Sequence, residues 1–404
     1  MEMGAGGVAD SMAEIRNLTI EDFDDRVALS EFAFQYAVSP EDKEQQRKNF
    51  RPEDVYGLFG DDGRMLSSLF ILPFEIWLRG RKLAMGGVAG VASWPDSRRQ
   101  GSIARLLTHS FEEMRRKGQS ISALYPFSYA FYRKYGYEMM TQKKQYTIEP
   151  RWFPPRRDTA GTVKLVEKSM ELLDPVYQTF AARYDGMLVR DRYWWDSRAL
   201  KAQMAAVYSN PSGQAEGYML YQVKDKHMKV FEWVALTEEA RIGLWSYAGN
   251  HDSMADQLTM TVPADDPLPF LLPEPRLKQE VTGHFMSRIV DAQAFVGQYR
   301  FEESDRTDEL LLHLEDGHAP WNEGLFQLRI EPSGKAALER VTRAAGDGGT
   351  SAVSLDIQTL TVMLAGNLRP RMLQRTGRLQ GAPESAALLE RRVPLVQPYL
   401  FDFF

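Results

Sequence analysis

The sequence predicts an α+β protein of mixed, mostly antiparallel sheets with flanking helices. Runs of apolar residues broken by turn residues predict strands that follow one another as meanders. Amphipathic stretches predict helices between them, and the order of helix, meander, helix and strand occurs twice, which suggests a weak internal repeat. The chain has 404 residues, and at roughly 100–200 residues per domain it is long enough for about two to four domains.

The composition is that of an ordinary globular protein and excludes several classes of function. Hydrophobic residues make up 44% and charged residues 26% of the chain. The net charge of -6 argues against a nucleic-acid-binding protein, which would need a surplus of basic residues to contact phosphates. The chain has no cysteine, so disulfides, thiolate zinc sites and cysteine nucleophiles are excluded.

No segment suggests a metal site or a membrane span. The six histidines are scattered without metal-ligand spacing, and there is no run of about 18 apolar residues. Residues 1–11 are rich in Gly and Ala and lack the basic start and apolar stretch of a signal peptide. We therefore expect a metal-free protein in the cytoplasm, with a disordered leader before a start near Met12.

The first repeat begins with a strand and a helix. Residues 13–18 are a predicted strand, and Thr19 stands where it would cap the following helix, with Asp22 three residues later. The polar stretch 39–51 is interpreted as an exposed loop or helix. Strands that form an antiparallel meander are predicted at residues 55–59, 65–78 and 83–93, with turns at residues 61–63 and 79–82.

A turn and an amphipathic helix follow this meander. The turn carries Arg98-Arg99-Gln100-Gly101, and the helix has an apolar side formed by Ile103, Leu106, Leu107, Phe111 and Met114. The N-terminus of a helix offers free N–H groups and the positive end of the helix dipole, which suits a pyrophosphate. Gly101 allows close approach of the backbone, and the arginines can add charged contacts. Taken alone, the pattern also fits an ordinary strand-to-helix turn.

The rest of the sequence completes the first α+β unit and predicts two further units. The first unit ends with a strand at residues 121–125, a short aromatic helix at 128–135, a strand at 137–149 and a linker at 150–157. The second is predicted to contain helices at residues 175–183 and 238–247 and strands at residues 203–208, 216–221, 228–236 and 257–262. Pro-rich segments at residues 266–269 and 273–275 mark a boundary. The third unit starts at Met286, with a helix at residues 292–299, strands at 309–314 and 324–331, and helical or mixed segments at 355–364 and 388–392.

Two motifs carry a resemblance to a known family. The turn Arg98 to Gly101 resembles the Arg/Gln-x-x-Gly-x-Gly/Ala motif of acyl-CoA binding in GNAT acetyltransferases, although Ile103 stands where that motif has Gly or Ala. Leu124-Tyr125-Pro126-Phe127-Ser128, followed by residues 131–137, is similar to the Eis family (enhanced intracellular survival) of GNAT N-acetyltransferases. The segment 266–269 and the aromatic, acidic C-terminus match that family too, so the resemblance covers residues 13–404.

The resemblance implies three domains. Residues 13–155 would form a catalytic GNAT domain that binds acetyl-CoA, and residues 156–285 a degenerate GNAT-like domain. Residues 286–404 would form a sterol-carrier-protein-like domain that delivers the C-terminal carboxylate. In the second repeat the helix begins with Thr237-Glu238-Glu239, and acidic residues there would repel a phosphate. We therefore expect only the first repeat to bind the cofactor.

The same resemblance implies the roles of single residues. Tyr132 would be the general acid that protonates the leaving thiolate, and the carboxylate of the last residue, Phe404, would be the base. The residues implied in acetyl-CoA binding are Val91, Ala92, Ser93, Arg98, Arg99, Gln100, Gly101, Ser102, Ile103, Ala104, Phe127 and Ser128. A phenol of pKa about 10 protonates a thiolate whose acid has pKa about 8.5 at a cost of about 2 kcal/mol, which a positioned site can absorb. The alternatives are that Tyr132 is a core residue and that the apolar tail, residues 399–404, docks for packing only.

The function implied is acetylation, by acetyl-CoA, of amines on cationic small molecules such as polyamines and aminoglycosides. Because the chain has no cysteine, direct transfer within a ternary complex is favoured over an acyl-enzyme. Acetylation of protein lysine is one alternative, and a lipid or ligand carrier that uses the C-terminal domain is another. No nucleic-acid partner is expected, and the resemblance implies a homo-oligomer, a hexamer.

Overall fold

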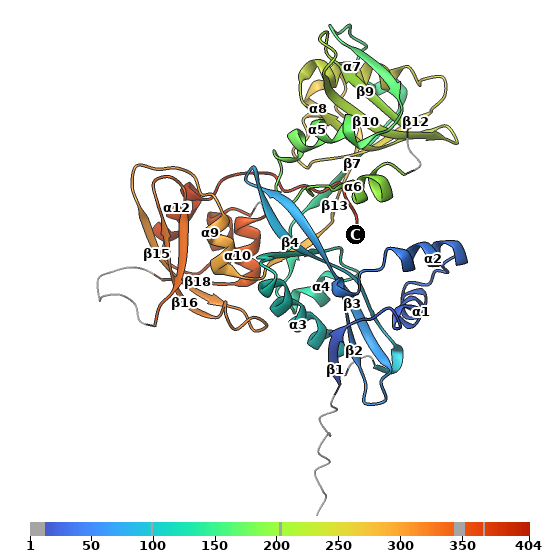
Figure 1. Ribbon diagram of the computed structural model, residues 1–404. Helices are drawn as coiled ribbons and strands as arrows, with labels where there is room; N and C mark the ends of the chain where they lie inside the picture. Colours follow the sequence, from blue (N-terminus) through green and yellow to red (C-terminus); the bar gives the residue numbers. More distant parts are fainter. Residues whose placement is uncertain (1–12, 98–99, 202–203, 343–351, 367) are drawn as a thin grey trace, which may run out of the picture.

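The described residues form three sheets, each with helices packed against it (Figure 1). The structure is a computed structural model that describes residues 13–97, 100–201, 204–342, 352–366 and 368–404. Its mixed sheets and flanking helices confirm the α+β class. Figure 1 shows the second sheet and its helices above the first, and the third to one side of it.

The first sheet has seven strands and is centred on its longest hairpin. In spatial order it consists of β1 (Glu14–Asn17), β2 (Val55–Phe59), β3 (Met65–Leu78), β4 (Arg81–Ser93), β5 (Ile121–Leu124), β14 (Met286–Ile289) and β6 (Glu138–Met139). Only β4 and β5 are parallel neighbours. The β3–β4 hairpin turns at Arg79 and Gly80, whose φ angles of 51° and 67° are both positive, as a two-residue hairpin loop of this kind requires. The helices beside this sheet are α1 (Phe23–Phe34), α2 (Pro40–Lys48), α3 (Ser102–Arg116) and α4 (Tyr129–Arg133).

The start of α1 differs from the prediction. The helix begins at Phe23, and its N-cap residue is Asp22 rather than Thr19. The backbone N–H and the hydroxyl of Thr19 both donate to the Asp22 carboxylate, at 2.7 and 3.1 Å. Arg16 pairs with the same carboxylate at 2.7 Å. These contacts hold residues 19–22 outside the helix, so the helix starts one turn later than predicted.

The second sheet repeats the arrangement of the first. In spatial order it consists of β13 (Lys278–Gly283), β7 (Gln142–Ile148), β12 (Gln257–Val262), β11 (His227–Ala235), β10 (Ala215–Lys224), β9 (Met204–Ser209) and β8 (Thr162–Val166). Its helices are α5 (Met170–Ala181), α6 (Arg192–Trp194), α7 (Glu238–Gly249) and α8 (Leu268–Leu271). β11 and β12 are parallel and are joined through α7, as β4 and β5 are joined through α3. The repeat in the sequence is therefore a repeat of the fold.

The third unit has a smaller sheet of four strands. In spatial order these are β17 (Ala336–Arg340), β16 (Gly324–Ile330), β15 (Asp308–Glu315) and β18 (Ala352–Asp356), and the helices are α9 (Ala292–Gln298), α10 (Ile357–Leu364), α11 (Pro370–Arg375) and α12 (Pro383–Arg392). β17 and α11 have no counterpart among the predicted elements, because both are too short to show a clear apolar period.

The first two sheets exchange strands. Residues 137–149, predicted as one strand, are divided into β6 in the first sheet and β7 in the second. Conversely β14, predicted to start the third unit, lies in the first sheet between β5 and β6. The chain crosses between the sheets at Met140–Thr141 and returns at His284–Phe285. The two crossings bond each other, since Met140 N–H donates to Phe285 O and His284 N–H to Thr141 O, both at 2.9 Å.

This exchange means that the sheets do not follow the expected domain borders after residues 155 and 285. The first sheet needs a strand from beyond the second border, and the second sheet needs a strand from before the first. An alternating apolar pattern indicates which face of a strand is buried but not which sheet the strand joins. The sequence pattern therefore could not reveal the exchange.

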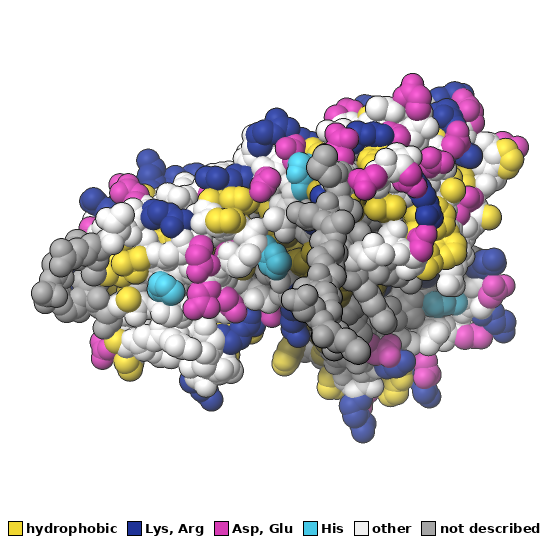
Figure 2. All heavy atoms as spheres, turned by 90° about the horizontal axis from the view of Figure 1, so that it is seen from below, with side chains coloured by type: hydrophobic (Ala, Val, Ile, Leu, Met, Phe, Trp, Pro, Cys, Tyr) yellow, Lys and Arg dark blue, Asp and Glu magenta, His cyan; other side chains and the backbone are white. Residues whose placement is uncertain are grey.

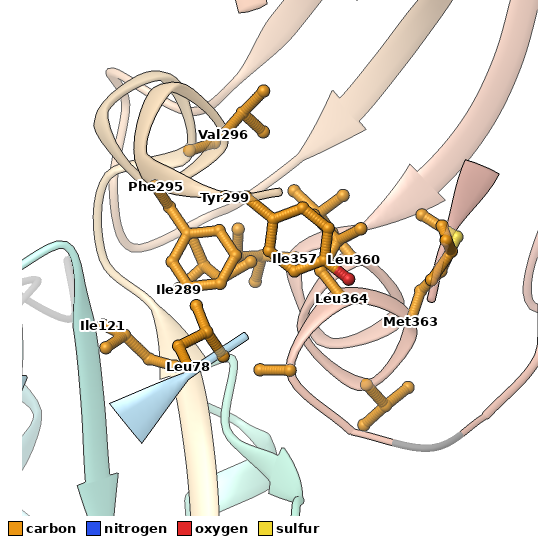
Figure 3. Packing of buried hydrophobic residues seen from close by; sticks show 14 of the residues in the cluster. Leu78, Ile121, Ile289, Phe295, Val296, Tyr299, Ile357, Leu360, Met363 and Leu364 are labelled. Carbon is orange, nitrogen blue, oxygen red and sulfur yellow. The ribbon is translucent and has the colours of Figure 1, made fainter. Parts of the chain in front are cut away.

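The first and third units share one hydrophobic core. Leu78 of β3, Ile121 of β5 and Ile289 of β14 pack together with Phe295 of α9 and Leu360 of α10 (Figure 3). None of these side chains is more than 3% exposed. Because apolar burial is continuous across the junction, the third unit is fixed to the first rather than tethered to it.

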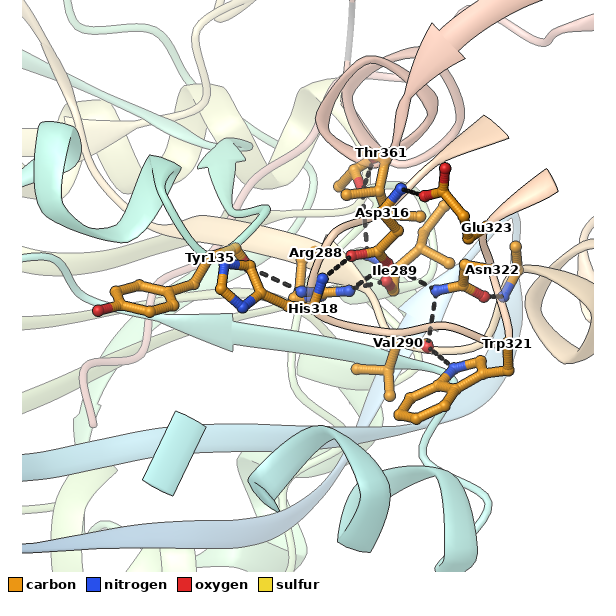
Figure 4. Close-up of polar contacts among 12 residues, drawn as sticks. Tyr135, Arg288, Ile289, Val290, Asp316, His318, Trp321, Asn322, Glu323 and Thr361 are labelled. Carbon is orange, nitrogen blue, oxygen red and sulfur yellow. Dashed lines mark hydrogen bonds and ion pairs between the residues drawn. The ribbon is translucent and has the colours of Figure 1, made fainter. Parts of the chain in front are cut away.

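A buried ion pair crosses the same junction (Figure 4). Arg288 of β14 lies 2.5 Å from Asp316, and both side chains are at most 1% exposed. Arg288 also donates to Tyr135 O at 2.7 Å, and the Asn322 amide donates to Asp316 at 2.9 Å. A buried charge pair loses hydration, and the attraction between the charges offsets this loss only where additional hydrogen bonds satisfy the remaining polar atoms. The pair therefore favours one specific docking of the two units.

The described residues offer neither a membrane span nor a metal-binding cluster. No helix among them is long and apolar enough to cross a membrane. Nor do they contain a group of three or more His, Cys, Asp or Glu side chains that could hold a metal ion. On the face shown in Figure 2, the described acidic and basic side chains are intermixed, with no continuous basic band.

The crossing at His284 predicts a pH dependence of stability. Burial, with a smaller effect of Lys143, lowers the pKa of His284 from the ordinary value of 6.5 to about 4. Well above pH 6.5 the imidazole is neutral in both the folded and the unfolded chain, and its ionisation has no effect on stability. As the pH falls through the window between these two values, the unfolded chain takes up a proton that the folded chain does not. The folded state thereby loses stability on the order of 3 kcal/mol.

We expect His284→Gln to lose less stability than the wild type when the pH falls from about 7 to about 4.5. The measurement is the urea midpoint of unfolding at both pH values. His313→Gln, at an exposed position on β15, is the control and should behave as the wild type. If the His284→Gln and wild-type proteins lose equal stability, the lowered pKa of the half-buried His284 imidazole is contradicted.

Candidate active site

Strands β4 and β5 separate part-way along their length. They are paired only from Met85 opposite Ile121 to Gly87 opposite Ala123, while β4 continues along β3 to Ser93. We call the region beyond Gly87 and Ala123 the β4–β5 divergence. Among the described strands, none pairs there with the edge of β4 that faces β5. Backbone N–H and C=O groups on that edge are available to a ligand with amide groups.

A bulge changes the direction of β4 within this divergence. The register against β3 shifts between Ala89 and Ala92, so that Gly90 and Val91 are inserted between paired residues. Gly90 has φ +56°, and a Cβ there would stand 2.8 Å from the Phe70 ring. Val91 is half-buried, and Ala92 and Ser93 are buried. The bulge thus places the three residues predicted to contact acetyl-CoA, Val91 to Ser93, at the end of β4.

The N-terminus of α3 has the features of an anion site. Its N-cap residue is Gly101, with φ +80°, and a Cβ there would meet no atom within 4 Å. The first intrahelical bond runs from Arg105 N–H to Gly101 O at 3.0 Å. The N–H groups of Ser102, Ile103 and Ala104 therefore have no acceptor within the helix. The first turn contains no acidic residue.

The residues before this helix are only partly described. Arg98 and Arg99, predicted to contact phosphate, lie outside the described residues. Gln100 is exposed, and its side-chain amide donates to Asp96 O at 2.8 Å. Asp96 itself pairs with Arg64 at 2.7 Å. The Gln100 side chain thus bonds back to the backbone of Asp96, and the Gln100 backbone leads directly to Gly101, the N-cap of α3.

The corresponding helix of the second unit, α7, differs in these respects. Its N-cap is Thr237, whose hydroxyl accepts from Ala240 N–H at 3.2 Å. Glu238 and Glu239 occupy its first turn. One N–H group is thus already satisfied, and two carboxylates stand at the positive end of the helix dipole, where an anionic ligand would be repelled. The start of α3 thus has neither the side-chain cap nor the acidic residues found at the start of α7.

Helix α4 carries the remaining predicted residues. Ser128 is its N-cap and accepts from Phe131 N–H at 3.3 Å, and Phe127 is 71% exposed. Tyr132 is only 3% exposed and packs in the same apolar cluster as Val88 and Leu124, the next residues of β4 and β5 after their last pair. Burial raises its pKa above the ordinary value for tyrosine. The Tyr132 phenol is therefore neutral over the physiological range.

The C-terminal tail runs from the third unit along the second to the first. In Figure 1 the chain leaves α12 and ends near the centre of the molecule, between the first two sheets. Tyr399 N–H donates to Asp185 O at 2.9 Å. Tyr399 and Leu400 are buried, and the Phe401 ring stacks on Phe180 at 5.9 Å. The tail is thus packed along its length rather than frayed.

The last residue lies at the β4–β5 divergence. The ring of Phe404 packs on Phe74 and Phe285, with centroids 4.7 Å apart in both cases. A ring carbon lies 3.0 Å from the place of a Cβ on Gly87, the last residue of β4 that pairs with β5. The neighbouring Phe403 is 59% exposed and packs 4.8 Å from the Tyr125 ring.

Sequence reasoning missed the aromatic residues that surround this terminus. Tyr125 stands within the motif from Leu124 to Ser128, so its position could have suggested a role. Phe74 lies in the middle of a long apolar strand, and Phe285 lies at the second crossing. Nothing in their local sequence distinguishes them from core residues. Only the strand exchange and the path of the tail bring them together.

Three family models match successive parts of the chain. An acetyltransferase (GNAT) domain model matches residues 14–140, and a second acetyltransferase (GNAT) domain model matches residues 186–289. A sterol carrier protein domain model matches residues 292–401. The models follow the order of the three units.

Similar proteins are acetyltransferases. An uncharacterized N-acetyltransferase of Streptomyces avermitilis is 26% identical over 367 residues, which cover 83% of this chain and 84% of that protein. The N-acetyltransferase Eis of Mycobacterium tuberculosis is 26% identical over 214 residues, 48% of this chain and 52% of that protein. A solved structure of a probable N-acyltransferase from Enterococcus faecalis has TM-score 0.89 and 28% identity, covering 98% of this chain and 100% of that one. Eis1 from Mycobacterium abscessus shares the fold, with TM-score 0.80, 20% identity and coverage of 97% and 100%.

The fold, the domain order and the relatives agree. GNAT acetyltransferases use acetyl-CoA as the acetyl donor, and two GNAT domains followed by a sterol-carrier-type domain are present here in one chain. The chain is thus an N-acetyltransferase, and it belongs to the Eis family of GNAT acetyltransferases.

Proposed function

We propose that this enzyme transfers the acetyl group of acetyl-CoA directly to an amine of a cationic small molecule, a polyamine or an aminoglycoside. The observation that carries the proposal is the position of Phe404, whose ring lies against Gly87 where β4 and β5 separate. By the family resemblance, the α-carboxylate of Phe404 would stand beside the strand edge that would hold the acyl donor and would be ionised at neutral pH. Its charge attracts an ammonium group and its oxygen can accept a proton.

The cofactor would extend from the start of α3 to the end of β4. The N–H groups of Gly101 to Ala104 would bind the pyrophosphate, with Arg98, Arg99 and the backbone of Gln100 beside them. The backbone of Val91 to Ser93 would bind the pantetheine amides, and Phe127 and Ser128 would contact the other side of the arm. The absence of a Cβ contact at Gly101 and of acidic residues in the first turn supports this placement.

Tyr132 would act as the general acid. The amine nitrogen forms a bond to the thioester carbon, the C–S bond breaks, and the departing thiolate takes the phenolic proton. Burial raises the pKa of Tyr132, which by itself weakens the acid. The thiolate leaves into the same poorly hydrated surroundings, which raise the pKa of its thiol as well. A positioned acid can therefore still transfer the proton to the thiolate.

Phe404 would act as the base. Its carboxylate takes the proton that the amine loses, directly or through a water molecule. The exposed rings of Tyr125 and Phe403 both pack on Phe285, as the ring of Phe404 does, and aromatic faces attract ammonium groups. A cationic acceptor is therefore favoured over a neutral one.

Each of the three units would have its own role. Residues 13–155 would be the catalytic part, residues 156–285 a degenerate GNAT part and residues 286–404 the part that delivers the terminus. The continuous core between the first and third units supports a scaffold role for the third over that of a lipid carrier. By the family resemblance the enzyme would be a homohexamer, and from the sequence we expect it in the cytoplasm.

A thiol-release assay with acetyl-CoA and a panel of amines tests the function. Spermidine, an aminoglycoside, a lysine-containing peptide and a neutral aromatic amine should be compared by kcat/KM. We expect the polyamine or the aminoglycoside to be the best substrate. If the peptide is best, the enzyme is a protein lysine acetyltransferase. Lipid that copurifies with a protein inactive on every amine would instead favour the carrier.

Tyr132→Phe should lower kcat by about 100-fold or more, because it removes the proton donor and keeps the ring in the core. The Kd of acetyl-CoA should not change. Tyr135→Phe, which makes the same change at a half-buried residue one turn further on, is the control and should keep full activity. Turnover by Tyr132→Phe at the wild-type rate would refute the acid role.

Adding two glycines after Phe404 should lower kcat by about 100-fold or more, because the carboxylate is displaced while the ring of Phe404 is kept. The same two glycines added at the N-terminus serve as the control. Stopped-flow or steady-state thiol release measures both. Full activity of the C-terminally extended enzyme would exclude the terminal carboxylate as the base.

A further inference from the structure

The tail is held by a buried charged group two residues before its end. The Asp402 side chain is 4% exposed. Its carboxylate accepts from Trp194 Nε1 at 2.7 Å and from Arg190 Nε at 3.0 Å. The side chain of Arg190 is only 1% exposed. Charge-assisted bonds of this kind are stronger than neutral ones and hold both partners in one geometry.

The second unit fixes Arg190 independently of the tail. Its terminal nitrogens donate to both oxygens of Glu232, on β11. Glu232 in turn accepts from the Tyr218 hydroxyl at 2.9 Å. The guanidinium also lies 4.0 Å from the Tyr177 ring centroid and 4.7 Å from that of Trp195. These contacts therefore fix the orientation of the Arg190 guanidinium, whose Nε–H donates to Asp402.

The segment before Arg190 is also bonded to the first sheet. Trp77 N–H donates to Met187 O, and Val189 N–H donates to Glu75 O, both at 2.8 Å. Since Glu75 and Trp77 belong to β3, this places Arg190 beside the hairpin that forms the candidate active site.

Trp194 continues the connection to the terminal residue. Its indole N–H binds Asp402, and its ring packs edge-on against Phe74 at 5.1 Å. Phe74 is the residue on which the ring of Phe404 packs. The anchor at Asp402 and the terminal ring are thus held by neighbouring side chains. Two residues of chain span at most about 7 Å, so the anchor confines the carboxylate to a small region.

We propose that Arg190 and Trp194 are positioning residues, which hold Asp402 and thereby set where the carboxylate of Phe404 stands at the β4–β5 divergence. The inference rests on the proposed role of that carboxylate. The second unit, whose α7 lacks the features of a phosphate site, thereby serves the active site of the first by fixing the end of the chain.

Asp402→Asn tests this inference with the smallest change of shape. The amide keeps one acceptor oxygen for Trp194 but turns an NH2 group toward Arg190, which is also a donor. Glu232 remains to pair Arg190, so no lone charge is left buried. We expect kcat to fall by about 100-fold, as a displacement of about 1 Å can cause, and the Kd of acetyl-CoA to stay the same.

Asp308→Asn is the matched control. Asp308 is a similarly buried carboxylate in the third unit, 3.6 Å from Arg392, whose side chain is 2% exposed. The substitution removes the same charge from a buried pair with arginine and does not touch the tail. It should leave kcat unchanged even where it lowers the melting temperature. Equal kcat values for Asp402→Asn and Asp308→Asn would overturn the positioning role.

Combining Asp402→Asn with the two-glycine extension after Phe404 separates the inference from the proposed function. If Asp402 acts through the carboxylate, the substitution causes no further loss of kcat in the extended enzyme, where the carboxylate is already displaced. A further loss of the same size as in the normal enzyme would show that Asp402 acts elsewhere and would overturn the inference. An extension without effect on kcat would instead overturn the proposed function.

Discussion

The hydrogen-bonded crossing of two chain segments between the first two sheets is the constraint on which the rest of the structure depends. Met140–Thr141 and His284–Phe285 each pass from one sheet to the other, and each bonds its counterpart. Neither sheet is complete without a strand that reaches it through this crossing. The two units therefore have a fixed relation, and Phe285 comes to lie beside the last residue of the chain.

Buried charges reinforce this relation at each junction. Arg288 and Asp316 join the first and third units, and Arg190 joins the second unit to the tail. Arg79, in the β3–β4 turn, pairs with Asp185 at 2.9 Å and donates to the hydroxyl of Tyr299. Buried pairs contribute little net stability, because the attraction between the charges has to offset their lost hydration, and it does so only in a favourable geometry. Such pairs therefore select one docking of the units over others.

The two repeats show that a shared fold does not decide which copy binds the cofactor. Both contain a parallel strand pair joined through a helix. In the first copy the N-cap of that helix is Gly101, and its first turn has no acidic residue. In the second copy the N-cap is Thr237, and Glu238 and Glu239 occupy the first turn. The difference lies in a few side chains at a helix terminus, where the dipole and free N–H groups act over a short range.

The sequence by itself determined the α+β class, the repeat, nearly all strands of the meanders and the contrast between the two helix starts. These follow from local patterns: the period of apolar residues, the turn residues and the charges beside a helix terminus. Through family resemblance it also singled out Tyr132 and Phe404, whose roles stay predictions. Only the tertiary structure decided that β7 and β14 exchange sheets, that Phe74 and Phe285 meet the terminus, and that Arg190 holds Asp402. These features depend on contacts between residues far apart in the chain. The local sequence around an apolar or charged residue does not indicate which distant residue its side chain will contact.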